Sequence, residues 1–129
     1  MIIRTEDYRI INRICGRFAP IDGNIIYLLA GEEGKEQGLL IYKPYKDGLV
    51  LHAELGKRLR GKNAKREFLD SLEWLKNNTD IKIIYAEIKA DKKTPAFMAV
   101  NSGMEYSHSE GFYRIYKMNL CKEAALCLT

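Results

Sequence analysis

The chain opens with apolar residues at the spacing of a helix. Four of them recur at intervals of three, four and seven positions: Tyr8, Ile11, Ile14 and Cys15. Thr5 stands before two acidic residues and is of a type that caps helix N-termini. We therefore predict a short amphipathic helix over residues 5–18 that begins after Thr5.

Strand-like segments come next. Residues 24–30 and 37–43 are apolar and rich in β-branched and aromatic side chains, and a glycine-containing stretch separates them. This pattern predicts an antiparallel hairpin. Residues 44–48 contain proline and glycine and predict a second turn, after which residues 49–55 form a third strand.

The third predicted strand has a clear division between its faces. Three leucines and one alanine occupy alternate positions, and the residues between them are Val50, His52 and Glu54. Because successive side chains of a strand point to opposite faces, His52 and Glu54 are expected on the same face.

The spacing of apolar residues along the chain then returns to that of a helix. Residues 64–76 carry apolar residues at helical spacing without proline or glycine, which predicts the longest helix of the chain. Residues 81–88 predict a strand, and a short helix from Thr94 or Pro95 to Val100 ends at Gly103. A closing hairpin is expected from residues 105–108 and 112–118. The predicted fold class is α/β in the α+β sense, a mixed, mostly antiparallel sheet flanked by helices.

Size and composition narrow the class of protein. With 129 residues, 47% hydrophobic and 29% charged, we expect one domain over residues 1–129. The apolar runs are too short for a membrane span, and no signal peptide is evident, so we expect a cytoplasmic protein with no membrane partner. Three cysteines without CxxC spacing argue against a zinc site, a redox pair or a disulfide framework.

Positive charge is concentrated in one place. The formal net charge is +4, yet six basic residues and no acidic residue lie between Lys57 and Arg66. This segment joins the third predicted strand to the long helix and contains Gly61. A helix N-terminus offers unpaired N–H groups and a partial positive charge, and glycine lets a phosphate approach the backbone closely. The segment therefore predicts a pyrophosphate site, although it matches neither the P-loop nor the dinucleotide fingerprint.

The arrangement of strand, R-x-x-G loop and helix resembles motif A of the Gcn5-related N-acetyltransferases. The loop residues that carry this resemblance are Arg58, Leu59, Arg60 and Gly61, and the later strand, short helix and Gly103-Met104 turn fall in the family's order. The likeness covers about residues 24 to 118, and small bacterial and phage members are the most similar. It implies that strands 49–55 and 81–88 splay apart around acetyl-coenzyme A, the cosubstrate.

The resemblance also implies which residues hold the cofactor. Pantetheine would pair with the strand backbone, and the pyrophosphate would lie over the loop and the start of the helix. The residues so assigned are Leu51, Ala53, Leu55, Arg58, Leu59, Arg60, Gly61, Lys62, Asn63, Ala64, Lys65 and Thr94.

Three positions depart from the family pattern. Asn63 stands where the loop usually ends in a small residue, and Thr94 replaces a common asparagine that contacts pantetheine. The third departure touches the chemistry, because Ala99 occupies the place of the tyrosine that commonly serves as general acid. No metal is expected.

The catalytic candidates follow from the needs of amine acetylation, which uses a base for the amine and an acid for the thiolate. Glu54, with His52 beside it, is the predicted base, although a solvated polar sheet face would show the same pattern. Tyr106 is the predicted acid, although a packed tyrosine with a surface hydroxyl is the alternative.

The predicted function is direct transfer of an acetyl group from acetyl-coenzyme A to an amine, on a small molecule or a protein. The alternative is a non-catalytic protein on the same scaffold, with a binding or structural role in a phage or in regulation. A nucleic acid is the competing partner for the basic segment, but the placement of the charges around a glycine at a strand-to-helix junction favours a phosphate group. The sequence leaves a homodimer open.

Overall fold

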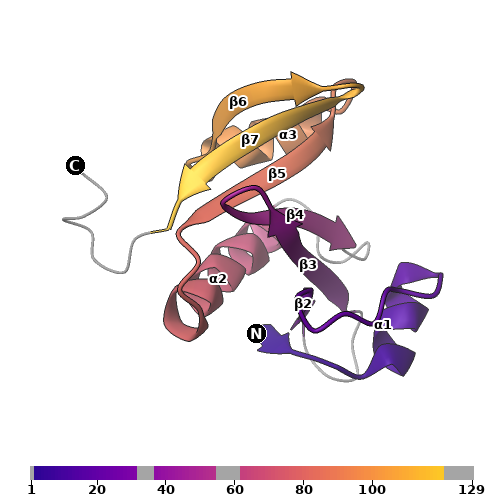
Figure 1. The fold of residues 1–129 in the computed structure, drawn as a ribbon. Coiled ribbons are helices and arrows are strands. Elements are labelled where there is room, and N and C mark those ends of the chain that lie inside the picture. Colours follow the sequence, from indigo (N-terminus) through magenta and orange to yellow (C-terminus); the bar gives the residue numbers. More distant parts are fainter. Residues whose placement is uncertain (1, 32–36, 55–61, 121–129) are drawn as a thin grey trace.

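The computed structural model describes residues 2–31, 37–54 and 62–120, and their elements form one seven-stranded sheet with three helices (Figure 1). In chain order the elements are β1 (Ile2–Arg4), α1 (Tyr8–Cys15), β2 (Ile26–Ala30), β3 (Gly38–Tyr45), β4 (Gly48–Glu54), α2 (Lys62–Asn78), β5 (Ile83–Lys89), α3 (Lys93–Asn101), β6 (Glu105–Glu110) and β7 (Tyr113–Asn119). The strand order across the sheet is β1-β2-β3-β4-β5-β7-β6. Every neighbouring pair is antiparallel except β4 and β5. The predicted fold class is confirmed.

The N-terminal segment differs from the prediction in two respects. Helix α1 is capped by Asp7, whose carboxylate accepts a hydrogen bond from the Arg9 N–H, and not by Thr5. Thr5 instead accepts a hydrogen bond from the Asp7 N–H, so it supports the capping residue. Strand β1 was not expected. It has only 3 residues, too few to show an alternation of apolar and polar side chains in the sequence, and it pairs with β2.

The turn between β3 and β4 is tighter than the sequence suggested. Strand β3 continues through Pro44 to Tyr45, in register with Leu49 and Gly48 of β4. The β2 ladder begins at Ile26 opposite Tyr42, so Pro44 lies beyond the end of β2. Proline has no backbone N–H, and at position 44 this absence interrupts no hydrogen-bond ladder with β2.

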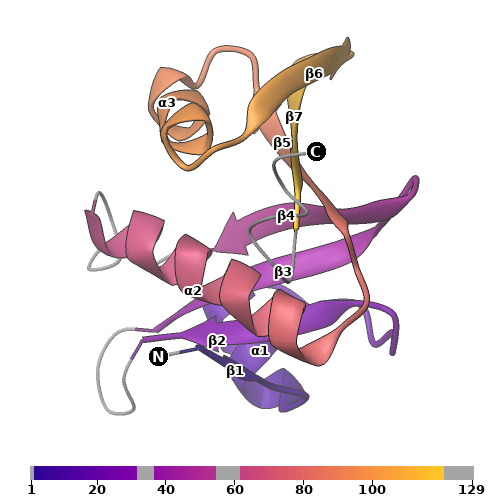
Figure 2. The ribbon, with the colours of Figure 1, turned by 90° about the vertical axis from the view of Figure 1, so that its left-hand side faces the viewer.

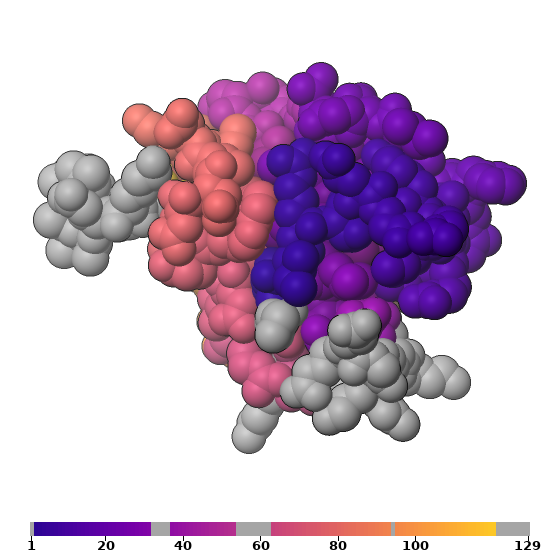
Figure 3. Space-filling model, turned by 90° about the horizontal axis from the view of Figure 1, so that it is seen from below, coloured from indigo at the N-terminus to yellow at the C-terminus, as the bar shows by residue number. Residues whose placement is uncertain are grey.

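The helices cover opposite faces of the sheet (Figure 2). Helices α2 and α3 lie on one face, where Phe68, Leu72 and Leu75 of α2 join buried residues from β2 to β5 in the larger core. Helix α1 packs on the other face, where Ile11 joins a smaller core from β2 and β3. Seen from below, the N-terminal segment lies against α2 (Figure 3). None of the helices in the described ranges is long and apolar enough to cross a membrane.

A buried hydrogen bond joins α2 to the middle of the sheet. The Ser71 hydroxyl donates to the Phe68 carbonyl at 2.6 Å and lies 2.7 Å from the Tyr42 hydroxyl. Because serine has one hydroxyl proton, Tyr42 is the donor in the second bond. Burial raises the pKa of Tyr42, which keeps it protonated. The pair fixes α2 over β3.

Strands β4 and β5 form a fork. Their parallel ladder pairs Leu49 with Ile84, Val50 with Tyr85 and Leu51 with Ala86, but β4 continues to Glu54 and β5 to Lys89. Beyond the ladder the two strands diverge (Figure 1). The predicted splay between these strands is confirmed.

Gly48 permits the closed end of the fork. A Cβ atom built on Gly48 would lie 2.0 Å from the Ile83 carbonyl oxygen and 2.8 Å from its carbon. Both are backbone atoms that cannot rotate away. Only glycine lets β4 start this close to β5, and the contact lies at the end of the ladder opposite the opening.

Gly48→Ala should therefore destabilise the protein. The added methyl group must push β4 and β5 apart, and we expect a loss of about 1 to 3 kcal/mol, as for other overpacked sites. Urea unfolding measures the change. Gly23→Ala is the control, because a Cβ there meets nothing within 4 Å, and its effect should stay within about 0.5 kcal/mol. Equal stability of the two variants would contradict the close contact.

Candidate functional site

A cavity of about 390 Å³ lies at the fork. It is bounded by β4 and β5 where they diverge, by the first turns of α2 and by α3. Its lining residues are Leu40, Leu51, His52, Ala53, Ala64, Phe68, Ala86, Glu87, Ile88, Lys89, Lys92, Pro95, Met98, Ala99 and Met104. The family resemblance implied a cofactor between these two strands, and the structure has a cavity there.

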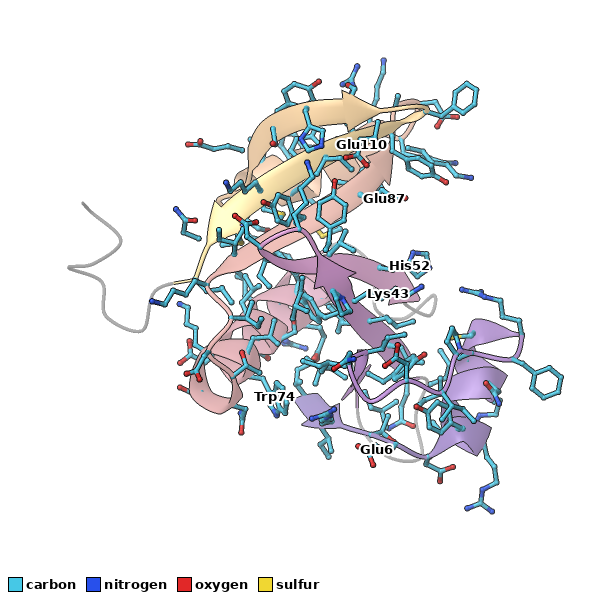
Figure 4. The ribbon with its side chains drawn as sticks, in the orientation of Figure 1. Glu6, Lys43, His52, Trp74, Glu87 and Glu110 are labelled. Atoms are coloured by element: carbon cyan, nitrogen blue, oxygen red, sulfur yellow. The ribbon has the colours of Figure 1, made fainter. Side chains whose placement is uncertain are left out.

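The two faces of the sheet give the cavity two kinds of wall. On the α2 and α3 side the wall is apolar, with Phe68, Met98 and Met104 among its members. His52 and Glu87 lie on alternate positions to Leu51 and Ala86, so they belong to the opposite face. Figure 4 shows them on β4 and β5 at the side where the strands diverge. An apolar acyl group and a polar reacting group can therefore meet across the fork.

Glu87 is the residue that the sequence reasoning missed. It follows Ala86, the last ladder partner on β5, just as His52 follows Leu51 on β4. Both side chains are exposed and both line the cavity. Alternation within the predicted strand 81–88 places Glu87 on the face opposite the core residues, and this signal could have identified it.

The predicted base Glu54 ends β4, opposite Leu39 of β3, and its side chain lies outside the described atoms. His52 and Ala53 line the cavity, as does Leu51. The structure thus brings three of the predicted β4 residues to the site.

The basic loop lies mostly outside the described residues, and Leu55, Arg58, Leu59, Arg60 and Gly61 all belong to that part. Helix α2 begins at Lys62 and has no acidic residue in its first turn. Asn63 is exposed, Lys65 is half-buried and Ala64 is buried in the cavity wall. A helix whose first turn carries no carboxylate suits an anion at its N-terminus.

Helix α3 provides the remaining wall. Thr94 stands in its first turn, between Lys93 and Pro95, and its side chain is not described. Pro95 occupies a position whose N–H would have no helical partner, so its missing donor costs nothing. Lys92, the N-cap residue, and Lys89 add positive charge to the lining.

Ala99 lies in the cavity wall and is almost completely buried. In the family that the chain resembles, this is the position of the tyrosine general acid, and here a methyl group takes the place of that side chain.

Tyr106, the predicted acid, lies elsewhere. It is not among the described residues that line the cavity. Its side chain is 56% exposed, and its hydroxyl is 2.7 Å from that of Ser109. Its ring meets Tyr116 edge to face, on the same face of the sheet as the larger core.

No protein-family model and no curated protein sequence matches the chain. Solved structures do match its fold. A chimera of the spermidine N-acetyltransferase SpeG from Vibrio cholerae and hSSAT aligns over 100% of this chain and 99% of its own, with a TM-score of 0.75 and 11% identity. A domain from Methanocaldococcus jannaschii aligns over 93% of this chain and 97% of its own, with a TM-score of 0.68 and 16% identity.

A third match is RimL, a ribosomal L7/L12 alpha-N-protein acetyltransferase. It covers 76% of this chain and 71% of its own, with a TM-score of 0.62 and 10% identity. Two of these three matches are named acetyltransferases. The chain has the fold of the Gcn5-related N-acetyltransferases.

Proposed function

We propose that the protein transfers an acetyl group from acetyl-coenzyme A directly to an amine. The observation that carries the proposal is the cavity at the fork. It has an apolar wall on the helix side, it ends in His52 and Glu87 on the other face, and it adjoins the start of α2. A thioester and an amine can meet there without crossing the sheet.

The cofactor would be bound in two parts. The β4–β5 ladder ends at Leu51 although β4 continues to Glu54, so the amides of an extended pantetheine can add to this edge of β4 as a strand would. The pyrophosphate would lie over the basic loop and the first turn of α2, where Lys62, Asn63 and Lys65 begin the helix. Thr94 and Lys92, at the start of α3, would contact the cofactor from the other side.

The reaction needs a proton acceptor on the open face. The amine nitrogen attacks the thioester carbon, the C–S bond breaks, and the proton of the nitrogen passes to a base, directly or through a water molecule. Glu87 and His52 stand at the opening of the fork, and Glu54 remains the third candidate. A thiol has a pKa of about 8 to 9, so its thiolate can leave without a strong acid.

The identity of the acceptor depends on the groove around the fork. SpeG is named for spermidine and RimL for a ribosomal protein, so one fold serves small and macromolecular amines. For this chain we propose an amine acceptor of either kind, in the cytoplasm, or in the host cytoplasm if a phage encodes it. An assembly of copies also belongs to the proposal, since one SpeG structure is dodecameric.

One observation favours a second candidate function. Ala99 removes the hydroxyl that the family resemblance would place at the thiolate, and Tyr106 lies away from the cavity. A protein that binds coenzyme A and performs no transfer would have the same structure. Its role would then be regulatory or structural.

Coenzyme A binding is the first test of the proposal. We expect titration calorimetry to detect acetyl-coenzyme A below 1 mM, and Gly61→Glu to weaken binding at least about tenfold through its carboxylate and added bulk. Gly23→Glu makes the same change at a glycine with open surroundings and should leave affinity unchanged. Equal affinities would remove the phosphate site from the loop, and absence of binding to the unmodified protein would end the proposal.

Glu87→Gln tests the base. It keeps the shape of the side chain and removes its proton affinity, so thiol release with a panel of amines and peptides should fall about 100-fold, within the usual range for a general base. Affinity for acetyl-coenzyme A should stay the same. Glu54→Gln is measured beside it, and a large loss there with none at Glu87 would move the role to Glu54.

Ala99→Tyr tests the missing acid. If transfer is limited by protonation of the thiolate, restoring the hydroxyl should raise thiol release at least about tenfold. Ala99→Phe is the control, because it adds the ring without the hydroxyl. Equal rates for the two variants would show that thiolate departure needs no acid here, and binding without release in any variant would favour the non-catalytic protein.

A further inference from the structure

A cluster of polar side chains outside the cavity joins the N-terminal half of the sheet, β1 to β4, to its C-terminal half, β5, β7 and β6. The tip of the β3–β4 hairpin, residues 45–48, reaches over the face of β5, β7 and β6 that is opposite α2 and α3. There the Tyr45 hydroxyl donates to the Glu110 carboxylate at 2.6 Å, and the Tyr85 hydroxyl donates to Asp47 at 2.5 Å. Each bond links the β3–β4 hairpin to the C-terminal half.

Further contacts surround these two bonds. The rings of Tyr45 and Tyr85 meet edge to face with centroids 4.8 Å apart. His108 Nε2 lies 2.8 Å from the Glu110 carboxylate and 3.3 Å from Lys46 Nζ. We call these six residues the clasp: Tyr45, Lys46, Asp47, Tyr85, His108 and Glu110.

A β-bulge in β6 makes the clasp feasible. Tyr106 pairs with Tyr116, but His108, and not Ser107, pairs with the next residue, Ile115. Side chains alternate along a strand, so a regular ladder would place Tyr106, His108 and Glu110 on one face. The extra residue turns His108 and Glu110 toward Tyr45 and leaves Tyr106 on the other face.

The charges of the clasp reinforce its geometry. Hydrogen bonds from Tyr45 and His108 hold the pKa of Glu110 below its usual value. The hydrogen bond to Glu110 raises the pKa of Tyr45 to about 12. At neutral pH a phenol therefore donates to a carboxylate, which is a charge-assisted bond. The same logic applies at Asp47, whose pKa is lowered by the hydrogen bond from Tyr85.

The position of the clasp relative to the cavity allows it to affect the angle between β4 and β5. Gly48 and the tip of the β3–β4 hairpin lie at the closed end of the β4–β5 ladder, and the fork opens at the other end. Across β7, His108 lies at the level of Glu87 and Glu110 at the level of Lys89. The bond from Tyr45 to Glu110 therefore ties the hairpin tip to the half of the sheet that diverges from β4. The described lining of the cavity contains no clasp residue, so the clasp can act on a bound ligand through the angle between the strands without contacting it.

We propose that the clasp sets the angle between the two halves of the sheet and so the width of the cofactor slot, with Tyr45 and Glu110 as positioning residues. The part that concerns coenzyme A rests on the proposed function. The part that concerns the angle does not, because it describes the protein without ligand.

The test uses Tyr45→Phe, Glu110→Gln and the double variant. Tyr45→Phe keeps the ring on Tyr85 and removes only the hydroxyl. Tyr27→Phe is the matched control, since its hydroxyl donates to the Pro20 carbonyl within the N-terminal half. Spin labels at Arg13 of α1 and Arg114 of β7, both exposed, report the distance between the halves in a background with all three cysteines changed to serine.

We expect the clasp variants to broaden and displace the distance distribution, and Tyr27→Phe to leave it unchanged. Acetyl-coenzyme A affinity should fall about two- to tenfold in each clasp variant, the scale of one hydrogen bond, and the double variant should lose no more than the larger single loss.

An unchanged distance distribution in the double variant would overturn the proposal, whatever the affinity. A changed distribution with unchanged affinity would refute the link to the slot. If the unmodified protein binds no coenzyme A while the distribution still responds, the proposed function fails and the role of the clasp in setting the angle stands.

Discussion

The site depends on one constraint, the short parallel contact between β4 and β5. Three paired positions join the strands, and each strand then continues without the other. A longer ladder would close the cavity, and a missing one would separate the halves. Because the core on the helix side extends across both strands through Leu49, Ile84 and Ala86, apolar burial stabilises the contact while the divergence leaves backbone groups for a ligand.

The fold was largely predictable because its periodicities are strong. Alternation in β4 and helical spacing in α2 each identified an element and its buried face, and the resemblance to the Gcn5-related N-acetyltransferases implied the fork. The pairing partners of β1 and the bulge in β6 could not be predicted. β1 is a short strand whose pairing depends on β2, and a bulge changes the register between strands without a clear mark in the sequence of either one.

The site was predicted less completely than the fold. His52 was identified because it precedes a recognisable loop, but Glu87 stands in a strand without such a mark. Its place in the cavity lining comes from tertiary structure, since the parallel register of β4 and β5 brings both Glu87 and His52 to the opening of the fork. Tyr106 shows the opposite case. It lies on the same face of the sheet as Tyr116 and the larger core, but the described lining of the cavity does not include it, and its hydroxyl contacts Ser109.

A transferase must remove a proton from the amine and must let the thiolate depart, and Ala99 bears only on the second step. In the proposed reaction the amine would lose a proton on the open face of the sheet, and the thiolate would form on the helix side, next to the apolar wall that contains Ala99. A carboxylate at Glu87 can serve the first step without serving the second. An apolar wall disfavours a bare thiolate, since burial of an unpaired charge is costly. Transfer on this scaffold therefore requires that the sulfur reach water or a backbone N–H as the C–S bond breaks. The edge of β4 beyond Leu51 would supply such groups only if the strands stay apart, so in the proposed reaction the width of the fork would bear on departure of the thiolate as well as on binding of the cofactor.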